Sequence, residues 1–73
     1  MKKIAKGYYK SDHKGYTISV WKFNHIDGGS YWQWYVSEPH PDFKDGLILI
    51  ENEYTGSKKQ SLSDAIYFID NQI

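Results

Sequence analysis

The chain contains no cysteine and no arginine. Without cysteine it forms neither disulfides nor thiolate metal sites, so a covalently stapled small fold is excluded. Because arginine is missing, all nine cationic residues are lysines, which lack the planar fork that grips a phosphate with two hydrogen bonds. Nine acidic residues balance them to a formal net charge of zero. This balance excludes both a strongly basic nucleic-acid clamp and an acidic DNA-mimicking surface.

Long hydrophobic runs are also missing. No segment approaches the roughly 18 apolar residues that a membrane-spanning helix needs. The N-terminal segment begins with Lys2 and Lys3, as a signal peptide does, but Lys6 and Gly7 interrupt the apolar stretch that should follow. We therefore expect a cytoplasmic protein that does not interact with membranes.

Aromatic residues are abundant instead. Three Trp, seven Tyr and three Phe make up 18% of the 73 residues. A chain of this length forms one domain, over residues 1–73, and such a small domain buries only about 60% of the surface that its unfolded chain exposes. Since each buried aromatic side chain removes roughly 150–250 Å² from water, we expect much of this aromatic content in the core.

Segments rich in Tyr, Trp, Ile and Val alternate with clusters of Gly, Pro, Asp and Ser, a pattern that is typical of strands joined by turns. These segments cover residues 4–10, 16–23, 31–37 and 47–54. Short connections favour an antiparallel meander. The tail differs, because its apolar residues recur at the spacing of one helix face. They are Leu62, Ala65, Ile66, Ile69 and Ile73, and Ser61 is the expected N-cap.

The predicted fold is therefore of the α+β class, with about four antiparallel strands and one C-terminal helix packed on one face. Alternation along the strands divides their side chains between two faces. The set predicted to face the helix is Ile18, Val20, Trp32, Trp34, Val36, Ile48 and Ile50. The set left on the opposite face is Trp21, Phe23, Tyr31, Tyr35, Leu47 and Leu49.

A single helix leaves the second face uncovered. Exposed apolar surfaces mark interaction sites, and Trp and Tyr are enriched at the cores of protein interfaces. The candidate protein-binding residues are Trp21, Phe23, Tyr31, Tyr35 and Leu49.

Several other interpretations of this face stay open. The loop over residues 38–46 could fold back and cover it, or a bulge could turn Trp21 and Phe23 inward. Two copies of the chain could meet through the same side chains and form a homo-oligomer. The aromatic rings could also stack on single-stranded nucleic acid, but the missing arginine and the dispersed lysines disfavour that interpretation.

Chemical motifs are scarce. The sequence contains no nucleophile elbow, P-loop or dinucleotide-binding fingerprint. His13, His25 and His40 lie in three separate turns, whereas zinc needs three or four converging ligands. We therefore expect no enzyme activity, no catalytic residue, no metal and no cofactor.

The layout resembles small uncharacterised proteins of phages and prophages, which have a sheet followed by a C-terminal helix. The points of resemblance are the segments Tyr16-x-Ile18-x-Val20 and Trp32-x-Trp34-Tyr35-Val36 and the tail from Ser61 to Asp70. Some proteins of this group inhibit host defences, as anti-CRISPR proteins do, by binding a protein surface. The resemblance implies a mobile-element protein that binds and modulates a host protein. It implies no functional residue.

Overall fold

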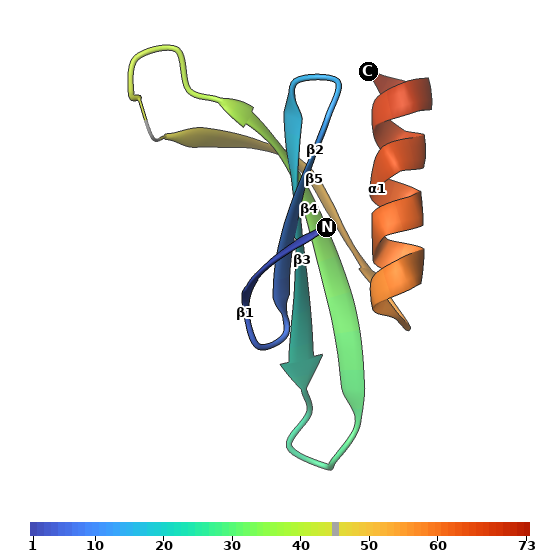
Figure 1. Ribbon diagram of the computed structural model, residues 1–73. Coiled ribbons are helices and arrows are strands. Elements are labelled where there is room, and N and C mark those ends of the chain that lie inside the picture. Colours follow the sequence, from blue (N-terminus) through green and yellow to red (C-terminus); the bar gives the residue numbers. More distant parts are fainter. Residues whose placement is uncertain (45) are drawn as a thin grey trace.

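The protein is one antiparallel sheet of five strands with one helix, as seen in a computed structural model that describes residues 1–44 and 46–73 (Figure 1). The strands are β1 (Lys2–Ala5), β2 (Tyr8–His13), β3 (Tyr16–Asn24), β4 (Ser30–Pro39) and β5 (Leu47–Thr55), and the helix is α1 (Lys58–Gln72). The strands follow one another in sequence order across the sheet, from β1 at one edge to β5 at the other. The predicted α+β class is confirmed, with five strands in place of about four.

The additional strand arises because the first predicted segment contains a turn. Lys6 and Gly7 separate β1 from β2, and Gly7 has a φ of 73°, in the left-handed region that glycine enters without strain. The next turn is a two-residue hairpin in which Lys14 and Gly15 both have positive φ, while His13 and Tyr16 pair across it. The first three strands therefore form two tight hairpins.

The core lies between α1 and the middle of the sheet, where Ile18, Val20, Trp34, Val36, Ala65 and Ile69 are buried. Trp32 is half-buried against this cluster. Four residues predicted to face the helix are thus core residues and Trp32 borders the core. The prediction is wrong for Ile48 and Ile50, whose exposed fractions are 37% and 36%. The part of the β4–β5 hairpin that carries them bends away from the helix (Figure 1).

The helix begins earlier than predicted. Its N-cap is Ser57, whose hydroxyl accepts a hydrogen bond from the backbone N–H of Gln60. Ser61, the predicted N-cap, lies inside α1 and is fully buried, where its hydroxyl is hydrogen-bonded to that of Thr55 at the end of β5. This pair attaches the first turn of the helix to the sheet. Among the residues described, no helix has the length and apolar character needed to cross a membrane.

Candidate protein-binding face

The face of the sheet opposite α1 carries several aromatic side chains, and we call it the aromatic face. Regular alternation in β3 and β4 places Trp21, Phe23, Tyr31 and Tyr35 on the side away from the helix, because their neighbours Val20 and Trp34 point toward it. Pairing with the adjacent strands adds two more tyrosines to this side. The aromatic face consists of Tyr8, Trp21, Phe23, Tyr31, Tyr35 and Tyr54.

Trp21 forms a stacked pair with Tyr8 across β2 and β3. These residues are directly opposite each other in the strand register, and their ring centroids are 3.6 Å apart with an angle of 12° between the planes. Stacked aromatic pairs of this kind contribute about 0.5–1.5 kcal/mol beyond the area that they bury. Trp21 nevertheless keeps an exposed fraction of 37%, so the pair is preformed and still accessible.

A second aromatic group surrounds Tyr31. The ring of Phe23 stacks on it at 5.3 Å, and the ring of Tyr54 meets it nearly edge-on at 5.2 Å. The imidazole of His25, which follows β3, lies 4.7 Å from the same ring. Tyr54 is the most exposed member, at 62%. Rings from β3, β4 and β5 therefore support one another in a fixed arrangement.

Polar groups occupy the centre of the aromatic face. The hydroxyl of Tyr35 donates a hydrogen bond to Oε1 of Gln33 at 2.7 Å, and Nε2 of Gln33 donates to Oδ1 of Asn52 at 3.2 Å. Gln33 is buried, so these bonds satisfy an amide that water does not reach. The pKa of Tyr35 is raised above its ordinary value of 10.0, mainly by burial and further by Tyr54 and Tyr31. Tyr35 is thus a neutral hydrogen-bonding group at physiological pH.

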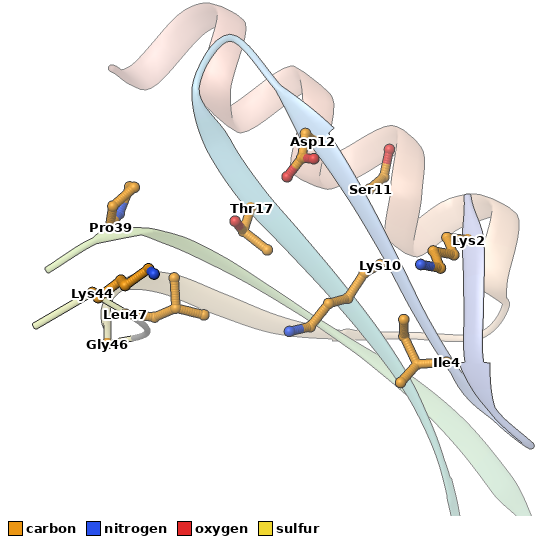
Figure 2. A pocket seen from close by; sticks show the side chains of 10 residues that line it. All are labelled: Lys2, Ile4, Lys10, Ser11, Asp12, Thr17, Pro39, Lys44, Gly46 and Leu47. Atoms are coloured by element: carbon orange, nitrogen blue, oxygen red, sulfur yellow. The ribbon is translucent and has the colours of Figure 1, made fainter.

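Beyond these rings the same side of the sheet becomes a hollow of about 450 Å³, which we call the lysine hollow. The described residues of its lining include Lys2, Lys10, Lys44 and Asp12. Figure 2 shows that β1 and β2 form one wall and the β4–β5 hairpin the other, with the Lys10 side chain extending toward the hairpin. The Nζ of Lys10 also lies 5.8 Å from the centre of the Tyr8 ring, so the lysine hollow adjoins the aromatic face.

A groove on the helix side carries carboxylates. A groove of about 350 Å³ between β5 and α1 is lined by Glu51, Glu53 and Asp64 together with Trp34, Tyr67 and other residues of the helix. Lysines therefore line the hollow on one side of the sheet, and carboxylates line the groove on the other. A chain with zero net charge thus has two surfaces of different electrostatic character.

The bulge that would turn Trp21 and Phe23 inward does not occur in β3. The register of β3 is regular through Trp21 and Phe23, which pair with Gln33 and Tyr31. Bulges lie elsewhere, between Lys3 and Ala5 and at the step from Val36 to Ser37. The described part of the 38–46 loop, without residue 45, contributes Pro39, Lys44 and Gly46 to the wall of the lysine hollow.

Four of the five predicted binding residues lie close together on the aromatic face: Trp21, Phe23, Tyr31 and Tyr35. Leu49 is on the same side but farther along, opposite Ser37 on the projecting hairpin. Tyr8 and Tyr54 were not among the predicted residues. Alternation in the first segment would have indicated Tyr8, whereas the bulge at Ile50 reverses the alternation of β5 and conceals Tyr54.

The three histidines have separate partners. His13 bonds to Asp70 of the helix at 2.9 Å, His25 packs on Tyr31, and Nδ1 of His40 accepts a hydrogen bond from the backbone N–H of Asp42. Within residues 1–44 and 46–73, no three His, Asp or Glu side chains gather in a way that could hold a metal ion.

Comparison with known proteins identifies no relative of this chain. No protein family matches the chain, no curated protein is significantly similar to it in sequence, and no solved structure is significantly similar to it in fold.

Proposed function

We propose that this protein is a non-catalytic interaction module that binds another protein through the aromatic face. The observation that carries the proposal is a set of six aromatic side chains on the uncovered side of a small sheet, fixed in place by stacking and hydrogen bonds. Rigid aromatic side chains are the residues that contribute most at protein interfaces, because ordering them on binding costs little entropy.

Ring geometry favours a protein partner over single-stranded nucleic acid. Bases stack on aromatic side chains whose flat faces are free. Here the facing surfaces of Tyr8 and Trp21 already cover each other at 3.6 Å. Tyr31 has three rings around it, within 5.3 Å. The rings therefore present edges and partial faces, which suit the side chains of a protein better than the plane of a base.

The lysine hollow indicates the chemistry of the partner. Among the described residues that line it are three lysines and one aspartate, which lie beside the aromatic side chains. A protein surface with an apolar patch next to Asp or Glu side chains would match both features, and charge complementarity would set its orientation and speed its association. That the partner is a host protein, and this chain a mobile-element protein that modulates it, is part of the proposal and rests on the resemblance in layout.

Site-specific photo-crosslinking tests the proposal. The exposed tyrosines Tyr54, on the aromatic face, and Tyr67, on α1 beside the groove that it forms with β5, have nearly equal exposed fractions of 62% and 65%. Each is replaced in turn by p-benzoylphenylalanine in the cell that produces the protein. We expect a discrete protein adduct from position 54 and none from position 67.

Three outcomes would contradict the proposal. Equal adducts from the two positions would mean nonspecific proximity, and no adduct from position 54 would mean that the face binds no protein. An adduct whose added mass is removed by nuclease would assign the aromatic face to nucleic acid instead.

A further inference from the structure

The first half of β5 is an apolar segment at the open edge of the sheet. Leu47, Ile48, Leu49 and Ile50 are consecutive, and their exposed fractions lie between 36% and 53%. β5 pairs with β4 on one side only, because it is the last strand in the order. Leu47 and Leu49 share the side of the aromatic face, and Ile48 is on the other side. Both faces of this edge strand are therefore apolar and accessible to water.

The two edge strands, β1 and β5, differ in length and charge, and these differences favour pairing with another strand at the β5 edge. β1, at the opposite edge, is four residues long, begins with Lys2 and Lys3, and carries a bulge. Short length, lysines and bulges are the features by which natural sheets prevent edge-to-edge association. The Leu47–Ile50 segment has no charge, and its hairpin projects away from the helix (Figure 1). β5 is nine residues long, and its first four residues, which end at the bulge at Ile50, carry no charge and no lysine.

We infer that this edge pairs in antiparallel orientation with the same segment of a second copy of the chain, which joins the two sheets into one continuous sheet. A two-fold axis normal to the sheet keeps each side chain on its own face, so residues that meet across the axis have the same orientation. With the axis at Ile48, that residue meets its own copy, and Leu47 meets Leu49 of the second copy. Apolar cross-strand pairs of this kind stabilise a sheet.

Charge also favours a second copy as the occupant. The segment is uncharged, so its antiparallel pairing with itself brings no like charges face to face. The chain as a whole has zero net charge, so two copies experience no net repulsion as they approach. A pairing over so few residues buries less than the roughly 1,200 Å² of a standard stable interface. The dimer should therefore be weak and depend on concentration.

Sedimentation velocity over micromolar to millimolar concentrations tests the inference. We expect the sedimentation coefficient of the parent protein to rise from the monomer toward the dimer value as concentration increases. Ile48→Lys, which places a charge at the axis, should remain monomeric throughout. Tyr67→Lys on the helix and Trp21→Thr on the aromatic face should dimerise like the parent. A parent protein that stays monomeric at millimolar concentration, or a dimer that Trp21→Thr abolishes, would overturn the inference.

A crosslinking measurement keeps the test valid if Ile48→Lys does not fold. Because the chain has no cysteine, Ile48→Cys introduces a single thiol. Side chains directly opposite each other in antiparallel strands have Cβ atoms about 4.5–5.5 Å apart, near the range that a disulfide spans. Under mild oxidation, Ile48→Cys should form covalent dimers much faster than Tyr67→Cys. Equal rates for these two variants would contradict the antiparallel edge pairing.

Discussion

Two tryptophans of this chain, Trp21 and Trp34, have opposite roles. Trp34 has an exposed fraction of 3% and packs on Phe68 of the helix, with ring centroids 5.9 Å apart. Trp21 lies one strand away on the other side of the sheet, where it stacks on Tyr8 and stays partly exposed. The alternation of strand side chains separates the two roles, because neighbouring residues of a strand point to opposite faces.

Substituting each tryptophan by alanine should therefore give different losses of stability. Trp34→Ala leaves a cavity in the core and should lower the free energy of unfolding by about 3–5 kcal/mol. A domain of this size has roughly 4–11 kcal/mol in total, so the variant should be largely destabilised. Trp21→Ala should cost about 1–2 kcal/mol, since it loses a stacked pair and only partial burial. Urea denaturation measures both, and equal losses would contradict the assignment of the two faces.

The carboxyl of Asp70 should make the stability of the fold depend on pH. Hydrogen bonds from Lys14, and then from His13, hold the pKa of this carboxyl below its ordinary value of 3.8. Nζ of Lys14 lies 2.6 Å from its Oδ1. A carboxyl whose pKa is lowered in the folded state stabilises the fold above its ordinary pKa, and the contribution is lost as pH falls through the lowered value.

The thermal midpoint of Asp70→Asn should accordingly lie slightly below that of the parent at neutral pH, because exposed ion pairs contribute little. The difference should shrink as the pH falls below 3.8 and disappear once the pH is below the lowered pKa of Asp70. Asp27→Asn, in the exposed turn after β3, is the control and should change the midpoint less at neutral pH. A difference that persists unchanged in acid would show that the charge of Asp70 does not stabilise the fold.

At the scale of the elements, the local sequence of α1 does not decide which of two serines is its N-cap. Ser57 and Ser61 are both residues that cap helices well, and the apolar stripe begins only at Leu62. The pattern Ser57-x-x-Gln60 is the capping signal that identifies the true start. Tertiary packing decides the role of Ser61, which is buried against Thr55.

Aspartate substitutions distinguish the two serines. Ser57→Asp should change the free energy of unfolding by less than about 1 kcal/mol, because Asp also caps helices and its charge suits the helix N-terminus. Ser61→Asp buries a carboxylate beside Thr55 and should cost several kcal/mol, since a buried charge without an opposite charge is strongly unfavourable. Thermal unfolding followed by circular dichroism compares the variants. A tolerated Ser61→Asp together with a damaging Ser57→Asp would restore Ser61 as the cap.

The strands show where sequence reasoning succeeds and where it fails. In β3 and β4 the alternation is unbroken, and the faces of Ile18, Val20, Trp21 and Trp34 follow from it directly. In β5 a bulge at Ile50 shifts the alternation by one residue, so Tyr54 joins the aromatic face unexpectedly. Ile48 does point to the helix side, but the hairpin bends away from the helix, and only the tertiary arrangement determines that bend.

The whole molecule is a sheet with two different sides. One side is closed by the helix, which completes the core. The other combines preformed aromatic side chains with the lysine hollow. A domain this small places about half of its aromatic residues outside its core, six on the aromatic face out of thirteen. Selection for stability alone would not require that arrangement, since exposed aromatic surface promotes association.

The central claim is that the aromatic face binds a protein. The most direct measurement is the affinity of the partner isolated by crosslinking from position 54, compared between Trp21→Ala and the matched helix variant Tyr67→Ala, after circular dichroism has shown both to be folded. A central aromatic contact predicts at least about a tenfold weaker complex for Trp21→Ala and an unchanged complex for Tyr67→Ala. Equal affinities for the two folded variants would contradict the claim.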